Sequence, residues 1–184
     1  MARASGAIAL LAVAGLLVAA CGSSNSPSAS SSSPTPSPSP KLFTSVDACT
    51  LVTATDASTA AGTPVTNLGG SSGAQVPGAC FYTSADGKST VIVFAQTYPD
   101  ATTAQSVSPE QIAAGINLGG AGVANAKAVT GIGDKAVEYT ITSSGSDGTA
   151  IFVFKSNVLI LIAVSPATSS TAVELLARTA VGRL

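Results

Sequence analysis

The sequence lacks histidine and tryptophan, and only 9% of its 184 residues are charged. Without histidine, the chain cannot form a Ser-His-Asp or Cys-His catalytic group, a His-ligated zinc site or a haem site with a histidine ligand. The 8 basic and 9 acidic residues give a formal net charge of −1, which does not suit the strongly basic surface of a nucleic-acid-binding protein. We therefore expect no nucleic-acid partner, no cofactor, no metal site and no catalytic residue.

The first 20 residues have the pattern of an export signal. Arg3 is their only charged residue, and an apolar run of twelve residues follows at 7–18. A transmembrane helix needs about 20 apolar residues, whereas a shorter run suits the central region of a signal peptide. Small residues then precede Cys21, and this arrangement resembles the lipobox of bacterial lipoproteins. The resemblance implies cleavage before Cys21 and its modification with diacylglycerol and palmitate-like acyl chains; the alternative is an ordinary secretory signal with an incidental cysteine.

A segment rich in serine and proline follows the predicted leader. Residues 22–40 contain ten serines and five prolines, so they cannot bury a core and are expected to be disordered. At about 3.1 Å per residue, such a segment reaches at most roughly 60 Å. We expect three parts: a signal peptide at 1–20, a lipidated cysteine with a disordered tether at 21–40, and one folded domain at 41–184.

Cysteine is scarce, with three residues in the whole chain. If Cys21 carries lipid, Cys49 and Cys80 remain as an even pair in an exported domain, where disulfides persist. We therefore predict a Cys49–Cys80 disulfide; the alternative is two buried free thiols.

Apolar periodicity and turn signals in 41–184 predict an α+β domain in the order ααββαβββα. Helices are expected over 46–61, after Pro99 and over 167–182, and strands over 80–84, 88–97, 136–142, 149–155 and 158–164. Short hairpin connections favour antiparallel pairing, so we expect a single, mostly antiparallel sheet of about five strands with helices packed on it. The Gly-rich segments 63–79 and 115–133 are expected to be loops.

Two local patterns concern the helices. Thr53 and Asp56 have the spacing of a capping box, and Gly62 is a suitable C-terminal stop. In the last helix the apolar residues form one stripe, but Leu175 falls outside it.

Candidate binding residues are few. Tyr82, Tyr98 and Tyr139 lie in or beside predicted strands, where core packing is the usual role and lining a ligand site is the alternative. Asp134 follows Gly131 and Gly133 in a G-x-G-x-x-A pattern. A strand rather than a helix follows this pattern, so we interpret it as a tight turn rather than a dinucleotide site, with Asp134 as a further candidate for ligand contact.

Several short motifs carry a family resemblance. They are the lipobox around Cys21, the Ser/Pro tether, "DACTLVT" at 47–53, "CFYTS" at 80–84, "GIGDKAVEY" at 131–139 and the final Arg183-Leu184. In these features the chain resembles small actinobacterial cell-envelope lipoproteins that carry a domain of unknown function. The resemblance implies anchoring at the outer face of the cytoplasmic membrane and a structural pair of domain cysteines, and it implies no activity.

These observations favour a ligand-binding, sensing or protein-interaction module over an enzyme. Its partners are expected to be the membrane, through Cys21, and an unidentified small ligand or envelope protein. The alternative is a cell-wall hydrolase that uses paired carboxylates, one with a raised pKa, and Asp134 and Glu138 are its first candidates. A passive component of envelope assembly is a third possibility.

Overall fold

The computed structural model describes residues 41–68, 76–116, 122–142, 147–167 and 169–184, which belong to one compact unit spanning 39–184. The predicted signal peptide, Cys21 and the tether lie outside the described residues. So do residues 69–75 and 117–121 of the two expected loops.

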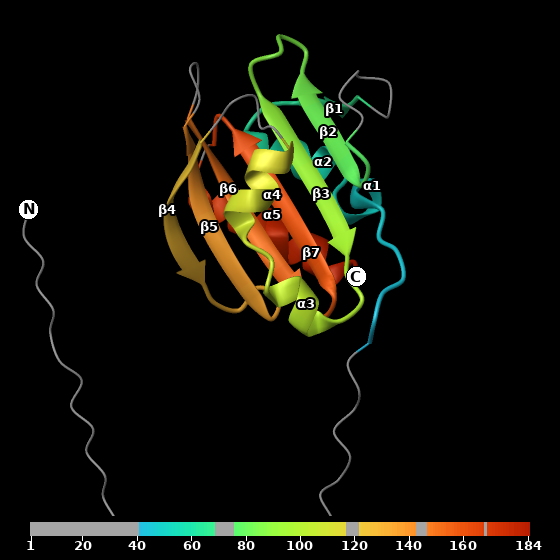
Figure 1. Ribbon diagram of the computed structural model, residues 1–184. Helices are drawn as coiled ribbons and strands as arrows, with labels where there is room; N and C mark the ends of the chain where they lie inside the picture. Colours follow the sequence, from blue (N-terminus) through green and yellow to red (C-terminus); the bar gives the residue numbers. More distant parts are fainter. Residues whose placement is uncertain (1–40, 69–75, 117–121, 143–146, 168) are drawn as a thin grey trace, which may run out of the picture. The chain divides into compact units, whose positions relative to one another are not determined.

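Within these ranges, the centre of the domain is a seven-stranded sheet in which every neighbouring pair is antiparallel. The strand order is β1-β2-β3-β7-β6-β5-β4 (Figure 1). The strands are β1 (Val65–Asn67), β2 (Ala79–Ser84), β3 (Thr90–Thr97), β4 (Gly122–Val129), β5 (Lys135–Thr142), β6 (Asp147–Lys155) and β7 (Val158–Ser165).

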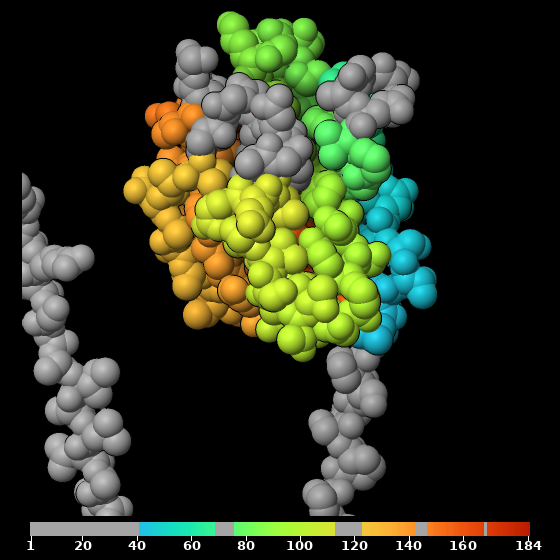
Figure 2. All heavy atoms as spheres, in the orientation of Figure 1, coloured from blue at the N-terminus to red at the C-terminus, as the bar shows by residue number. Residues whose placement is uncertain are grey.

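Helices cover both faces of this sheet. Three of those described pack on one face, and two lie on the opposite face, which Figure 2 shows in space-filling form. The first group is α1 (Ala48–Leu51), α2 (Ala54–Ala61) and α5 (Ser170–Gly182), and the second is α3 (Ala101–Gln105) and α4 (Pro109–Ile116).

The predicted class is confirmed, but the predicted number of strands is wrong. The described domain is α+β with one antiparallel sheet of seven strands rather than about five, in the order ααβββααββββα. The two additional strands, β1 and β4, are the edges of the sheet and arise from segments expected to be loops. β4 is hard to recognise because a β-bulge interrupts its pairing between Ala124 and Lys127, and Asn125 has a φ of 55°. The helical region expected after Pro99 consists of two short helices, α3 and α4.

The central strand β7 explains why the domain needs two helical layers. Its side chains alternate between the faces, with Ile160 and Ile162 in the core beneath α5 and Leu159 and Leu161 in the core on the other side. All four are 0% exposed. A strand that is apolar on both faces must be covered on both, as its sequence predicts.

The predicted disulfide is confirmed. Cys49 of α1 is bonded to Cys80 of β2, with their Cα atoms 5.1 Å apart. The bond therefore fixes the first helix to the sheet. The predicted capping box is present as well: the Thr53 hydroxyl accepts from the Asp56 amide, and the Asp56 carboxylate accepts from the Thr53 amide. Gly62 ends α2 with a φ of 69°.

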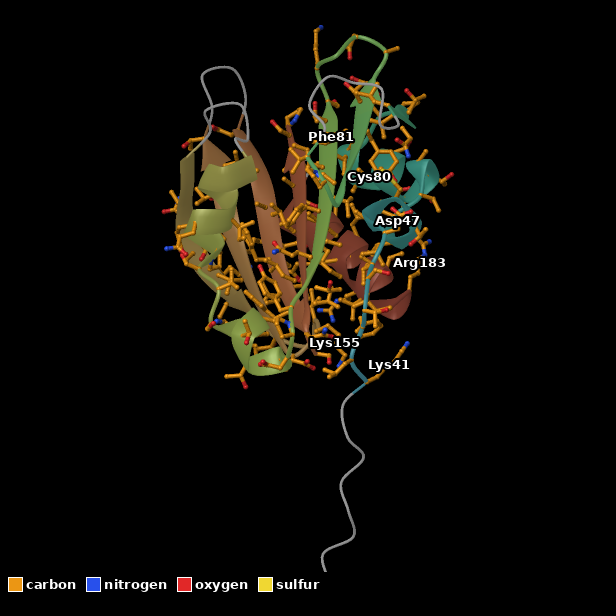
Figure 3. All side chains as sticks on the ribbon, turned by 45° about the vertical axis from the view of Figure 1, so that its right-hand side comes forward. Lys41, Asp47, Cys80, Phe81, Lys155 and Arg183 are labelled. Carbon is orange, nitrogen blue, oxygen red and sulfur yellow. A yellow bond between two sulfur atoms is a disulfide. The ribbon has the colours of Figure 1, made fainter. Side chains whose placement is uncertain are left out.

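The segment that enters the domain is held by the turn between β6 and β7. The Asn157 side chain accepts from the Phe43 amide at 2.8 Å and donates to the Phe43 carbonyl at 2.8 Å. The Ser156 hydroxyl donates to the Lys41 carbonyl at 2.6 Å. Figure 3 shows Lys41 and Lys155 at this same end of the domain. The start of the described chain thus has a fixed position at one end of the sheet.

Candidate functional site

A shallow groove runs between α2 and α5 on the outer side of the helical layer. Its volume is about 120 Å³. Leu175 stands on its wall with 58% of its surface exposed, the highest value among the large apolar residues of the described chain. The groove is lined by Asp56, Thr59, Ala60, Ala172, Leu175, Leu176 and Thr179.

Helix caps and one ion pair position the walls of this groove. α2 starts at the Thr53–Asp56 capping box, and the Ser169 hydroxyl accepts from the Ala172 amide at the start of α5. At the other end of α5, Arg183 Nη1 donates to Asp56 Oδ2 at 2.6 Å and to the Leu51 carbonyl at 2.8 Å. In Figure 3, Arg183 lies on the side of the domain that carries α1 and α2. The C-terminal end of the chain is therefore fixed to both short helices.

This ion pair also sets the charge state of the groove. The hydrogen bond from Arg183, followed by the bonds from Thr53, lowers the pKa of Asp56 from 3.8 to about 2. Asp56 therefore remains ionised at neutral pH, and Arg183 balances its charge. The other residues that line the groove are uncharged.

The structure separates the three tyrosines that the sequence offered as ligand-lining residues. Tyr82 is 1% exposed beneath α1 and α2, and its hydroxyl donates to the Val52 carbonyl. Tyr139 is 5% exposed in the opposite core, edge-on to Phe152 at 5.4 Å between ring centres. Its hydroxyl donates to Glu110 Oε1 at 2.8 Å. Burial, then this hydrogen bond, raises the pKa of Tyr139 to about 12.

Tyr98 and Asp134 do not join those tyrosines in a common pocket. Tyr98 is half-buried against the core that contains Tyr139, and burial raises its pKa. Asp134 is exposed in the turn before β5, where it accepts from Lys155 Nζ at 2.8 Å and from the Ser156 amide at 2.6 Å. The hydrogen bond from Lys155 is the main reason that the pKa of Asp134 is lowered. Asp134 thus stabilises the β6–β7 turn.

A second carboxylate, Glu138, has different surroundings. It is 8% exposed, and one oxygen, Oε2, is buried without a hydrogen-bond partner. Its other oxygen lies 3.7 Å from Lys127 Nζ, which is also 3.7 Å from Glu174. Asp134 and Glu138, the first candidates for a carboxylate pair, are thus engaged by different lysines. Across the described residues, no three His, Cys, Asp or Glu side chains gather as a metal site requires.

The groove could not be predicted from the sequence because it depends on contacts between residues distant in the chain. Asp56 and Arg183 are separated by 127 positions, and no local pattern relates them. The one local signal was Leu175, an apolar residue outside the stripe of its helix. The structure shows that Leu175 faces solvent at the groove instead of the core.

The fold and the groove define an α+β domain with a shallow hollow between two helices, α2 and α5. No protein-family model and no curated protein matches the chain. Among solved structures, it is similar to the extracellular domain of PknH from Mycobacterium tuberculosis, with 12% identity and a TM-score of 0.39. The match covers 61% of this chain and 66% of that one, slightly less than two thirds of its length. In the part of the chain that the structure describes, no helix has the length and apolar character needed to cross a bilayer.

Proposed function

We propose that this protein is a lipid-anchored protein-interaction module of the cell envelope, whose contact surface is the α2–α5 groove. The observation that carries the proposal is Leu175, a large apolar side chain that is 58% exposed at the wall of a groove. Contiguous exposed apolar surface marks interaction sites, and Leu175 adjoins the apolar lining residues Ala60, Ala172 and Leu176 of the groove.

Two features support an exported and anchored protein. The Cys49–Cys80 disulfide fits an oxidising compartment, because cytosolic thiols are kept reduced. The apolar run at 7–18, the small residues before Cys21 and the tether at 22–40 have the order expected of a lipoprotein leader. A lipid on Cys21 would then hold the domain at the outer face of the cytoplasmic membrane.

A protein partner suits the groove better than a small ligand does. Pockets for small molecules are usually about 300–1,000 Å³ and enclose most of the ligand, whereas this groove has a volume of about 120 Å³. The three tyrosines named as candidates for a ligand site pack their rings against the two cores instead.

The hydrolase alternative receives less support. A general acid requires a raised pKa, but the hydrogen bond from Lys155 lowers the pKa of Asp134. Glu138 and Glu174 both lie 3.7 Å from the single cation Lys127, so Glu138 is engaged by a lysine and not paired with Asp134.

The anchor is tested by mass spectrometry of the full chain purified from membranes. We expect a mature N-terminus at Cys21 that carries lipid, and we expect Cys21→Ser to move the protein to the soluble fraction. An intact Met1 or an unmodified Cys21 in membrane-bound protein would contradict the anchor.

The contact surface is tested with a photo-crosslinking amino acid at position 175, produced in the native envelope. Position 105, on α3 and on the other face of the sheet, is the matched exposed control. We expect protein crosslinks at 175 and few at 105. Equal yields at the two positions would refute the proposed surface.

A further inference from the structure

We propose that the Cys49–Cys80 disulfide exchanges with outside thiols through one sulfur only: Cys49 carries the mixed disulfide, and Cys80 is the sulfur that leaves. The partner is defined by its chemistry, as a molecule with an ionised thiol. This inference goes beyond the proposed function, because it concerns a covalent modification site on α1 and not the α2–α5 groove. Three observations support it: the exposure of the two cysteines, the groups around Cys80 and the elements that hold each cysteine.

The two cysteines differ in their access to solvent. Cys49 is half-buried on α1, where Asp47 and Thr50 on either side of it are exposed. Cys80 on β2 is 2% exposed and belongs to the core beneath α1 and α2. Thiol–disulfide exchange requires a thiolate to reach one of the two sulfurs, so its rate depends on access to that sulfur. Attack from outside is therefore directed to Cys49.

The groups around the Cys80 sulfur suit a sulfur that leaves. Asn67 Nδ2 donates to it at 3.3 Å, and an N–H donor stabilises the negative charge of a thiolate. The Tyr82 hydroxyl oxygen lies 3.5 Å from the same sulfur. Because the Tyr82 hydrogen is donated to the Val52 carbonyl, this oxygen can accept from a protonated Cys80 thiol. Both forms of a released Cys80 thus have a hydrogen-bond partner in place.

The exchange step replaces one disulfide by another. A thiolate, RS⁻, attacks Cys49 Sγ and forms an R–S–S bond to Cys49, while the bond to Cys80 breaks and its electron pair leaves on Cys80 as a thiolate. In the reverse step the Cys80 thiolate attacks Cys49 and releases RS⁻. Neither direction needs a further oxidant or reductant. Formation of the bond from a partner's disulfide therefore also passes through a mixed disulfide on Cys49.

The elements that hold the two cysteines also favour a group on Cys49. α1 has only 4 residues, and so short a helix has little stability of its own. Its movement can make room for an attached group at the surface. Cys80 lies in β2, which is paired with β1 on one side and β3 on the other. A group on Cys80 would have to be accommodated inside the core, where close packing leaves little space.

The first test compares two matched variants in the full chain with Cys21→Ser. Cys80→Ser leaves Cys49 as the single cysteine, and Cys49→Ser leaves Cys80, while both lack the disulfide. Each is treated with 2-hydroxyethyl disulfide, an uncharged probe, and the adduct is followed by mass spectrometry. We expect Cys49 to react at least about tenfold faster than Cys80 in the folded protein, and the two rates to become equal in urea. Equal rates in the folded variants would overturn the proposal.

The second test uses the oxidised Cys21→Ser chain, which keeps the disulfide, and it decides alone if the single-cysteine variants unfold. The protein is treated with 2-mercaptoethanol or with a thioredoxin whose second active-site cysteine is serine. Products are quenched with acid, alkylated and mapped by mass spectrometry. We expect the attacking thiol on Cys49 and the alkylating group on Cys80. An adduct with only one of the two thiols supports Cys49 as the site and identifies the partner as a small thiol or a protein thiol. Adducts mainly on Cys80, an equal distribution, or no adduct from either thiol would refute the assignment.

Discussion

At the scale of single residues, Tyr82 and Tyr139 use their hydroxyl groups in different settings. The Tyr82 hydroxyl donates to the carbonyl of Val52, a residue that is 0% exposed. The Tyr139 hydroxyl donates to Glu110, a residue at the exposed start of α4. Removing a donor costs most when its acceptor remains buried and unsatisfied.

We therefore predict that Tyr82→Phe destabilises the domain more than Tyr139→Phe does. The expected loss is about 1–3 kcal/mol for Tyr82→Phe and about 0.5 kcal/mol for Tyr139→Phe, because water can solvate the Glu110 carboxylate. Urea unfolding followed by circular dichroism measures both. Equal losses would show that the Val52 carbonyl finds another donor.

Asp56 gives the domain a predictable response to acid. Its pKa is about 2 in the folded protein and 3.8 without its partners, so its stabilising effect is complete above pH 3.8 and disappears as the pH falls towards 2. With a discount for partial exposure, we expect Asp56→Asn to cost about 1–2 kcal/mol at pH 6. The difference from wild type should shrink steadily in urea titrations between pH 4 and pH 2.

The variant Arg183→Gln is the matched control for that prediction. It removes the partner that contributes most to the lowered pKa of Asp56 and should flatten the acid response to a similar extent. A difference between Asp56→Asn and wild type that stays constant down to pH 2 would contradict the assigned role of the ion pair.

At the scale of elements, the turn before β5 depends on a glycine that the sequence already marked. Gly133 has a φ of 61°, and a Cβ at this position would lie 2.5 Å from the Phe154 carbonyl oxygen and 2.7 Å from Val153 Cγ1. Gly87 in the β2–β3 turn has a similar φ of 71°, with nothing within 4 Å of its Cβ position. The two glycines thus share a backbone conformation and differ in the space around them.

We predict that Gly133→Ala destabilises the domain by about 3 kcal/mol or more, and Gly87→Ala by about 1–2 kcal/mol. Both losses of stability include the cost of a left-handed conformation for alanine. The additional loss in Gly133→Ala comes from the clash of its Cβ with β6. Thermal unfolding of the two variants measures the difference. If both lost the same stability, the close approach to Phe154 would have no energetic importance.

The sequence predicts those elements whose signals are local. Strand β7 follows from a continuous apolar run, the capping box from the spacing of Thr53 and Asp56, and the end of α2 from Gly62, and all three are present. The edge strand β4 escaped because its bulge at Ala124 and Lys127 interrupts a regular pattern. The groove could not be predicted because all seven strands lie between α2 and α5 in the sequence, so no local pattern relates the two helices. In the sequence, the groove is indicated only by Leu175, an apolar residue that lies outside the apolar stripe of α5.

At the scale of the whole molecule, the Cys49–Cys80 bond joins the helical layer to the sheet. The bonded residues are 31 positions apart, and α2 and β1 lie between them in the chain. α1 and α2 together form only a small part of the core, so packing alone holds them weakly on the sheet. The disulfide adds a covalent constraint. The same bond holds α1, whose Leu51 carbonyl receives Arg183 from the end of α5.

We therefore predict that the double variant Cys49→Ser/Cys80→Ser loses about 3.5–4 kcal/mol of stability, on the chain-entropy estimate for a loop of this length. Reduction of the wild-type bond in denaturant should give the same loss on refolding without oxidant, because both changes release the same loop. Hydrogen exchange should show the release first in α1 and α2, which the bond and the contacts of Arg183 with Leu51 and Asp56 hold in place, while β6 and β7 keep their protection. Uniform loss of protection across the sheet would instead mean that the bond is needed by the whole core and not mainly by α1 and α2.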